Sequence, residues 1–191
     1  MKKIAILASG TGSNAENIAK YFANSQLAKV EILLHDREQA PVVEKMKALG
    51  IETSFFPRSE WKTDCSKIVG LLEAHGIDLI VLAGFTSIIG NEIIEAFNGK
   101  IINIHPSLLP KFGGKGMWGD NVHRAVIEAG ETESGITIHY VTPEIDGGGI
   151  IAQFRCPVEP GDTPETLATR IHRLEHLNFP PTIETLLHQN H

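Results

Sequence analysis

Nearly continuous apolar runs alternate with amphipathic stretches along the first hundred residues. A strand buried on both faces gives such a run, without the polar alternation of a strand that has one face in water. Apolar residues three or four apart, such as Ile18, Tyr21 and Phe22, indicate helices between the runs. Strands are expected over 4–8, 30–35, 53–56, 78–83 and 101–105, and helices around 18–22, over 41–49 and over 60–75. This alternation predicts an α/β fold, a doubly wound and mostly parallel sheet with helices on both faces.

The pattern changes after residue 110, where glycines become frequent. Residues 111–119 hold four glycines beside Met117 and Trp118, and we expect a mobile loop there. Two β-like runs, 135–141 and 149–158, predict an antiparallel addition to the sheet. Helices are expected over 121–129 and from Pro164 onward. The second helix has Thr163 as its N-cap and should break at Pro180-Pro181. Its core-facing residues are expected to be Leu167, Ile171 and Leu174.

The bulk properties bound the class of protein. A length of 191 residues suits a single domain, and a net charge of −6 argues against a general nucleic-acid binder. The longest apolar runs are far too short to span a bilayer. The first of them ends at Ser9–Asn14 after about five residues, shorter than the apolar region of a signal peptide. We therefore expect a cytoplasmic protein with neither a nucleic-acid nor a membrane partner.

Two cysteines, Cys65 and Cys156, are present. They fit neither a disulfide framework nor a paired-cysteine metal site. We interpret both as packing residues.

The most informative stretch follows the fifth apolar run. Asn103 and His105 are two residues apart, so the strand period of two points both side chains to the same side. Pro106 cannot donate to a sheet ladder, and Pro110 closes the following turn. An amide and an imidazole are thus delivered together at the end of a buried strand, where open α/β sheets bind ligands.

A glycine-containing loop, Ser9 to Asn14, joins the first strand to the first helix. Its two glycines allow successive backbone amides to face one concavity, and the helix start adds partial positive charge. The loop therefore predicts a cradle for a phosphate. The pattern Gly10-x-Gly12-x-x-Ala15, with Asp36 further on, also meets the dinucleotide fingerprint, and this alternative stays open.

Three acidic or metal-binding candidates lie in the second half. His172-x-x-Glu175-His176 matches an inverted zinc-protease pattern, but nothing else in the chain indicates the third ligand that such a site needs. Glu175 is of more interest as a carboxylate able to bind hydroxyls or an amine. The alternative is that it is an ordinary surface glutamate. Asp146, followed by three glycines, is a short acid on a flexible loop or a simple turn residue.

Together these motifs resemble the folate-dependent formyltransferase family over nearly the whole chain. The run Asn-x-His-Pro-Ser-Leu-Leu-Pro with a later Asp-Gly-Gly is specific to its members that use 10-formyltetrahydrofolate. The early glycine loop is typical of the branch that formylates glycinamide ribonucleotide. The resemblance rests on Gly10-Thr11-Gly12-Ser13-Asn14, Ala83-Gly84-Phe85, Asn103 to Pro110, Asp146-Gly147-Gly148 and Glu175-His176.

The resemblance implies direct attack of the glycinamide amine on the formyl carbon, through a tetrahedral oxyanion, as a step of purine synthesis. Asn103 and His105 would donate to the oxyanion, and Asp146 would be the partner of His105. 10-Formyltetrahydrofolate would be the co-substrate, and no metal is expected. Residues 1–100 would form the phosphate-binding and ribotide-binding half, and 101–191 the catalytic and folate-binding half. The ribotide would contact Gly10, Thr11, Gly12, Ser13, Asn14 and Glu175, and the folate Phe85, Thr86, Ser87, Ile88, Ile89, Asn103, Thr142, Pro143, Glu144, Ile145 and Asp146.

Two features depart from the family pattern. Ser87 stands where well-known bacterial members have an arginine, and Arg58 lies near a second such position, although Trp61 aligns closer to it. The loop 111–121 is several residues longer than usual and includes Trp118, which suggests a lid. Two other hypotheses remain: an NAD(P)-dependent oxidoreductase built on the glycine loop and Asp36, and a non-catalytic module that senses folate or phosphate.

Overall fold

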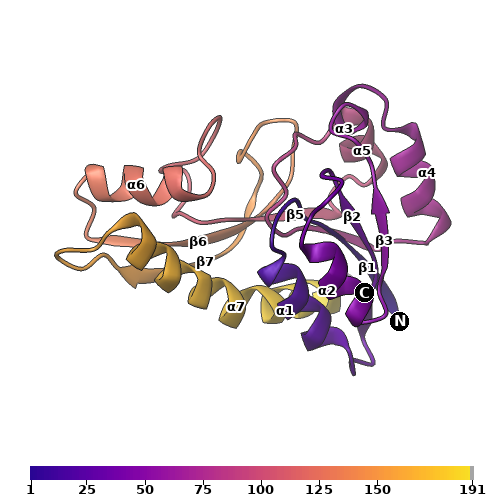
Figure 1. The fold of residues 1–191 in the computed structure, drawn as a ribbon, viewed down its shortest axis with the longest axis horizontal. Coiled ribbons are helices and arrows are strands. Elements are labelled where there is room, and N and C mark those ends of the chain that lie inside the picture. The colour runs from indigo at the N-terminus through magenta and orange to yellow at the C-terminus, as the bar shows by residue number, and fades with distance from the viewer. Residues whose placement is uncertain (190–191) are drawn as a thin grey trace. The chain divides into compact units, whose positions relative to one another are not determined.

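The computed structural model describes residues 1–189, which form a seven-stranded sheet flanked by helices (Figure 1). The strands follow the order β3-β2-β1-β4-β5-β6-β7. The pairs β1–β2, β1–β4 and β2–β3 are parallel and β6–β7 is antiparallel, so the predicted architecture is confirmed. The strands are β1 (Lys2–Leu7), β2 (Ala28–His35), β3 (Glu52–Phe55), β4 (Leu79–Leu82), β5 (Ile101–His105), β6 (Glu133–Tyr140) and β7 (Ile150–Pro157). The helices are α1 (Ser13–Phe22), α2 (Val42–Ala48), α3 (Glu60–Thr63), α4 (Ser66–Ala74), α5 (Asn91–Ala96), α6 (Asp120–Glu128) and α7 (Pro164–Gln189).

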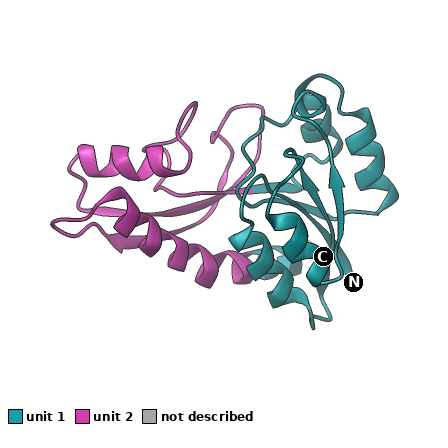
Figure 2. Cartoon of the chain, viewed as in Figure 1, with its two compact units in different colours: residues 1–102, 183–191 teal, residues 103–182 magenta. Residues whose placement is uncertain are grey.

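The chain divides into two compact units (Figure 2). Unit 1 comprises Met1–Ile102 together with the segment from Ile183 onward, and unit 2 comprises Asn103–Thr182. The functional halves expected from the sequence, 1–100 and 101–191, remain a prediction.

The core of unit 1 is built on β1 and β4. Both strands are inaccessible over most of their length, which agrees with apolar runs that lack polar alternation. Helix α1 buries Ala15, Ile18 and Phe22, which are three or four residues apart. Gly50 ends the α2 region with φ of 71°, a conformation that glycine adopts readily.

One helix expected over 60–75 is instead two, α3 and α4, and that prediction was wrong. Asp64 has an extended backbone, with φ of −148°, and its carboxylate accepts a hydrogen bond from the Ser66 hydroxyl at 2.7 Å. A short acidic side chain that bonds to groups ahead of it competes with helix continuation. Cys65, at the break, is buried and free, as is Cys156, in agreement with their interpretation as packing residues. The short helix α5, to which no element was assigned, was missed.

The β6–β7 hairpin dominates unit 2. Gly135 lies where the strands approach closely, since a Cβ there would come within 2.0 Å of the Phe154 carbonyl oxygen. The register shifts between Ile138 and His139, where a bulge changes the regular alternation of side chains. Both predicted runs, 135–141 and 149–158, thus lie in the antiparallel pair that was expected.

Helix α7 continues through Pro180-Pro181, so the expected break is wrong. A proline in a helix interior lacks a backbone donor and its ring clashes with the carbonyl four residues before it, at a cost of about 3 kcal/mol. Apolar side chains on both sides of the pair offset this cost, because Phe179, Ile183 and Leu187 are almost completely buried. The burial of these side chains in the folded protein therefore outweighs the local tendency of proline to end a helix. Of the predicted core positions of this helix, Leu167 and Ile171 are buried and Leu174 is half-buried.

Among residues 1–189, no helix combines the length and the apolar character needed to cross a membrane.

The turn before α7 is fixed by a carboxylate. Asp162 accepts hydrogen bonds from the Arg170 guanidinium at 2.6 and 3.2 Å and from the Glu159 N–H at 2.8 Å. The Arg170 side chain holds the pKa of Asp162 well below its usual range. A carboxyl whose pKa is lowered by folding stabilises the protein above its unfolded pKa of about 3.9, and this contribution is lost as the pH falls below that value.

We expect Asp162→Asn to lower the melting temperature by a few degrees at pH 7, and the gap to wild type to narrow as the pH is reduced from 7 to 3. Thermal unfolding followed by circular dichroism across this range is the measurement. Glu133→Gln, which removes a carboxylate from an exposed pair with Arg155, is the matched control and should change stability less. A difference in melting temperature between wild type and Asp162→Asn that stays constant with pH would contradict a stabilising role of the Asp162 charge.

Candidate active site

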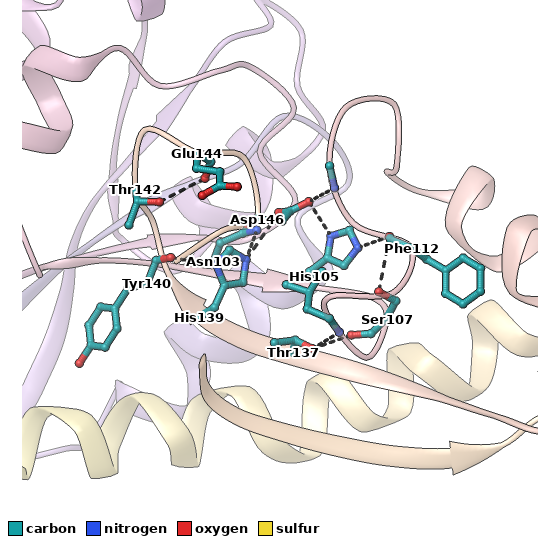
Figure 3. Close-up of polar contacts among 12 residues, drawn as sticks. Asn103, His105, Ser107, Phe112, Thr137, His139, Tyr140, Thr142, Glu144 and Asp146 are labelled. Atoms are coloured by element: carbon teal, nitrogen blue, oxygen red, sulfur yellow. Dashed lines mark hydrogen bonds and ion pairs between the residues drawn. The ribbon is translucent and has the colours of Figure 1, made fainter. Parts of the chain in front are cut away.

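His105 lies at the end of β5 with its imidazole almost completely buried (Figure 3). Its Nε2 is 2.8 Å from the carbonyl oxygen of Phe112. Because a carbonyl only accepts, Nε2 carries a proton, and Nδ1 is the nitrogen that faces the Asp146 carboxylate at 3.6 Å from Oδ2. The ring is therefore fixed in orientation, with one nitrogen anchored and the other directed at a negative charge.

Asp146 joins the glycine-rich loop to two histidines. Its Oδ2 accepts a hydrogen bond from the Gly114 N–H at 2.8 Å, and its Oδ1 is 3.6 Å from Nε2 of His139. The residue has φ of 55°, which Asp tolerates better than most residues. Asp146 is thus more than a turn residue, since its carboxylate lies between His105 and His139 (Figure 3).

His139 determines how the Asn103 amide is oriented. Its Nδ1 donates to the Tyr140 carbonyl at 2.9 Å, so Nε2 is left as an acceptor for the Asn103 Nδ2–H at 3.2 Å. Burial lowers the pKa of His139, which keeps the ring neutral and able to accept. The second hydrogen on Nδ2 remains for another acceptor.

His139 was given no role in the sequence analysis. Its part depends on which residues of two strands face each other, and the bulge at Ile138/His139 alters that register. The sequence offers one weak signal for a role of His139: this histidine lies on a predicted strand next to the hairpin loop that carries Asp146.

A second layer of hydrogen bonds fixes the turn that follows β5. The buried Thr137 hydroxyl donates to the Ser107 carbonyl at 2.7 Å and accepts from the Leu109 N–H at 3.0 Å. The Ser107 hydroxyl donates to the Lys111 carbonyl at 2.7 Å. This network returns the chain to Phe112, whose carbonyl anchors His105 (Figure 3).

The glycine loop of unit 1 has the geometry of a helix-start cradle. Gly12 adopts φ of 68° immediately before α1, and no side chain in the described part of the chain caps this helix end. The first N–H groups of a helix lack partners within it, so they are suited to bind an anion. Ser9 joins the loop to the segment that follows β4, because its N–H donates to the Gly84 carbonyl and its hydroxyl accepts from the Thr86 N–H.

The two glycines of this loop differ in what they tolerate. A Cβ on Gly12 would lie 2.0 Å from Cγ2 of Val42, whereas a Cβ on Gly10 would meet nothing within 4 Å. Gly12 is therefore required by packing and backbone conformation, and Gly10 borders open space.

Asp36, the residue proposed for a dinucleotide ribose, is engaged inside unit 1. Its side chain is inaccessible, and Oδ2 accepts from the Ser87 hydroxyl at 2.6 Å and lies 3.3 Å from Nε of Arg58. Arg58 also donates to the Thr86 hydroxyl at 3.1 Å. An aspartate bound in this way is not available to a ribose, which argues against the oxidoreductase hypothesis.

The segments expected to bind folate are partly exposed. In unit 1, Phe85 packs its ring edge-on against Trp61 at 4.6 Å between centroids, Ile88 is exposed and Ile89 is buried. In unit 2, the Thr142 hydroxyl donates to the Glu144 carbonyl, which shapes the loop around Pro143, and Ile145 is exposed.

Glu175 is not an ordinary surface residue. It is only 6% exposed and lies on α7 at i+4 from Ile171 and i−4 from Phe179, in the buried row of the helix. Nδ1 of His172 is 3.1 Å from its carboxylate. Within residues 1–189, no group of three His, Cys, Asp or Glu side chains is arranged to hold a metal ion.

Of the expected site residues, unit 2 brings Asn103, His105 and Asp146 together and also holds residues 142–145 and Glu175. Unit 1 holds Gly10 to Asn14 and Phe85 to Ile89.

Comparison with known proteins is consistent across sequence and structure. Residues 2–183 match the family model described as formyl transferase. The chain is 41% identical over 194 residues to phosphoribosylglycinamide formyltransferase of Bacillus subtilis (strain 168), with 100% of this chain and 97% of that protein covered. The crystal structure of phosphoribosylglycinamide formyltransferase from Bacillus halodurans superposes with a TM-score of 0.89 at 37% identity, covering 100% and 97% of the two chains. The enzyme of the same name from Anaplasma phagocytophilum gives 0.90 at 35% identity, covering 98% and 88%.

The neutral state of His139 predicts a pH dependence of stability. A histidine whose pKa is lowered by folding binds protons more readily when unfolded, so stability falls as the pH drops below the unfolded value of about 6.5. We expect wild type to lose up to about 1.4 kcal/mol more than His139→Gln between pH 7.5 and pH 5.5. Urea unfolding at both pH values is the measurement, and equal losses in the two proteins would show that His139 is not a buried neutral group.

Proposed function

The chain belongs to the formyl transferase family, and from that premise we propose that it transfers the formyl group of 10-formyltetrahydrofolate to the amine of glycinamide ribonucleotide in de novo purine biosynthesis. One observation carries the proposal. The Asn103 amide, the His105 imidazole and the Asp146 carboxylate converge after a buried strand, each held by a further partner. The relatives named phosphoribosylglycinamide formyltransferase support glycinamide ribonucleotide as the acceptor of a formyl group.

The reaction needs hydrogen-bond donors for an oxyanion, an acceptor for the proton of the amine and a donor of a proton to N10, and we propose that this cluster supplies all three. The amine nitrogen attacks the formyl carbon, and the carbonyl oxygen becomes an oxyanion that requires hydrogen-bond donors. The amine then loses a proton, N10 of the folate gains one, and the C–N10 bond breaks. No bond to the protein forms in this sequence, so no nucleophilic side chain is needed.

Asn103 and His105 are the proposed oxyanion donors. One hydrogen of Asn103 Nδ2 is directed to His139, which leaves the other for the oxyanion. His105 is anchored through Nε2, so Nδ1 is the atom that donates to the intermediate or exchanges a proton with it.

Asp146 is proposed to act on His105. Its carboxylate lies 3.6 Å from Nδ1 and can orient a water between the substrate and the ring. The bond from the Gly114 N–H keeps that carboxylate in place.

The ribotide is proposed to bind through its phosphate at Gly10 to Asn14 and through its ribose or glycinamide end at Glu175. Backbone N–H groups at a helix start support the first contact. A buried carboxylate supports the second.

The folate is proposed to contact Asn103, the Phe85–Ile89 segment and the Thr142–Asp146 segment. Ser87 bonds to Asp36 and Arg58 is held beside Thr86, so the position that bears arginine in well-known bacterial relatives is used differently here.

We also propose that the whole chain acts as one catalytic domain in the cytoplasm, on small molecules alone and without nucleic acid, membrane or metal. The acidic net charge of −6 supports the part of this proposal that concerns nucleic acid.

A direct assay tests the function. The purified protein is supplied with glycinamide ribonucleotide and 10-formyltetrahydrofolate, and release of tetrahydrofolate and formation of the formylated ribotide are followed together. Tetrahydrofolate release that does not depend on the ribotide would contradict the proposal. So would ligand binding without turnover, which would instead support a sensing module.

Gly10 provides a test of the phosphate cradle that does not disturb packing. Gly10→Ala should weaken ribotide binding about tenfold, or about 1.4 kcal/mol, because the methyl group occupies open space bordering the loop. Folate binding should be unchanged, and both affinities are measured by calorimetry. Gly70→Ala, in α4 with nothing within 4 Å of the added Cβ, is the matched control. An equal loss for both ligands would argue against the assignment.

The Asp146 charge is tested by Asp146→Asn, which keeps an oxygen for the Gly114 N–H but removes the negative charge beside His105. We expect kcat to fall on the order of 10²-fold, with far smaller changes in ligand affinity. Steady-state kinetics over a range of pH is the measurement, with Glu128→Gln on the exposed side of α6 as the control. Near-normal kcat in Asp146→Asn would reduce Asp146 to a loop-forming residue.

A further inference from the structure

A buried tryptophan of unit 1 has no part in the chemistry proposed so far. Trp61 lies in the short helix α3 and is the largest side chain in the described part of the chain that is completely buried. Its indole Nε1 donates to the Phe56 carbonyl at 2.9 Å, and the Phe56 N–H donates to the carbonyl of His35, the last residue of β2, at 3.0 Å. The indole is therefore linked to the end of a sheet strand and its orientation is fixed.

Trp61 contacts the segment from Phe85 to Gly90 at both of its ends. The Phe85 ring packs edge-on against the indole, with 4.6 Å between ring centroids. At the other end, the Trp61 carbonyl accepts a hydrogen bond from the Gly90 N–H at 2.7 Å. The second contact leaves no space, because a Cβ on Gly90 would lie 2.8 Å from Cys65 Sγ and 3.0 Å from the Trp61 carbonyl oxygen. One residue thus fixes where this segment begins and where it ends.

The residues between the two contacts are the accessible ones. Thr86 and Ile88 are exposed and Ser87 is half-buried. The Thr86 N–H donates to the Ser9 hydroxyl at 2.9 Å, and the Ser87 hydroxyl donates to the Asp36 carboxylate at 2.6 Å. The segment is therefore an accessible arc whose shape is set by contacts within unit 1, which reduces the conformational freedom that a ligand would have to remove on binding.

We infer that Trp61 is a positioning residue for the folate: by holding both ends of the Phe85–Gly90 segment, it sets the conformation in which this segment receives 10-formyltetrahydrofolate. The inference rests on the proposed function, because it concerns the affinity for that co-substrate. Trp61 acts through the segment and not by touching the ligand. The ribotide is proposed to bind at other residues, so its affinity should not depend on Trp61.

Two variants test the ring contact. Trp61→Leu removes the ring that meets Phe85, whereas Trp61→Phe keeps an aromatic ring and loses the hydrogen bond to the Phe56 carbonyl. We expect Trp61→Leu to raise the KM for 10-formyltetrahydrofolate on the order of tenfold, with the KM for the ribotide within about twofold of wild type. Tetrahydrofolate binding, measured by calorimetry without turnover, should weaken by a similar factor. Trp61→Phe should recover most of the folate affinity.

A matched control separates this effect from a general loss of packing. Leu72 on α4 is as deeply buried as Trp61. Leu72→Ala should lower the melting temperature and leave both KM values unchanged.

Gly90→Ala tests the second contact without changing the tryptophan. The backbone of Gly90, with φ of −69° and ψ of 153°, accepts alanine, but the added methyl group must displace the segment or the turn at Trp61. We expect the same selective rise in the KM for folate. Gly70→Ala, whose added Cβ meets nothing within 4 Å, should behave as wild type.

A wild-type KM for folate in Trp61→Leu or in Gly90→Ala would overturn the inference. So would an equal rise in both KM values, or a Trp61→Phe protein that binds folate no better than Trp61→Leu. If melting temperatures show that Trp61→Leu does not fold, Gly90→Ala decides. Absence of both formyl transfer and tetrahydrofolate binding in the wild type would overturn the proposed function itself, and so is distinct from these outcomes.

Discussion

The position of the Asp146 carboxylate is the constraint on which the site depends. One of its oxygens holds the Gly114 N–H, and the two oxygens face different histidines, which serve different purposes. His139 is neutral and accepts from Asn103, while His105 has one nitrogen anchored and one directed at the negative charge. A single carboxylate thereby joins an amide, two imidazoles and a glycine-rich loop into one cluster.

The sequence was sufficient where local pattern and tertiary burial agree. Apolar runs without alternation placed β1, β4 and β5, and the period of two placed Asn103 and His105 on the same side of one strand. Asn103, His105 and the turn after them lie within one short segment, so their local geometry follows from strand and turn rules.

The sequence was insufficient where the deciding interaction joins distant residues. The contact of His139 with Asn103 depends on strand register and on a bulge, neither of which a single sequence specifies. The continuation of α7 through two prolines depends on the burial of Phe179 and Ile183, which outweighs a valid local rule. The division between α3 and α4 falls at Asp64, whose carboxylate accepts a hydrogen bond from the Ser66 hydroxyl.

The unbroken course of α7 has a consequence for how this helix can change. Glu175 takes its place from the helical phase it shares with Ile171 and Phe179. Adding or removing one residue between them would rotate the positions beyond it by roughly 100° about the axis and turn a buried row outward. The segment can therefore diverge by replacement of side chains but not by change of length. Length variation among relatives should instead collect in the connections, such as the glycine-rich stretch before α6, where no helical phase has to be kept.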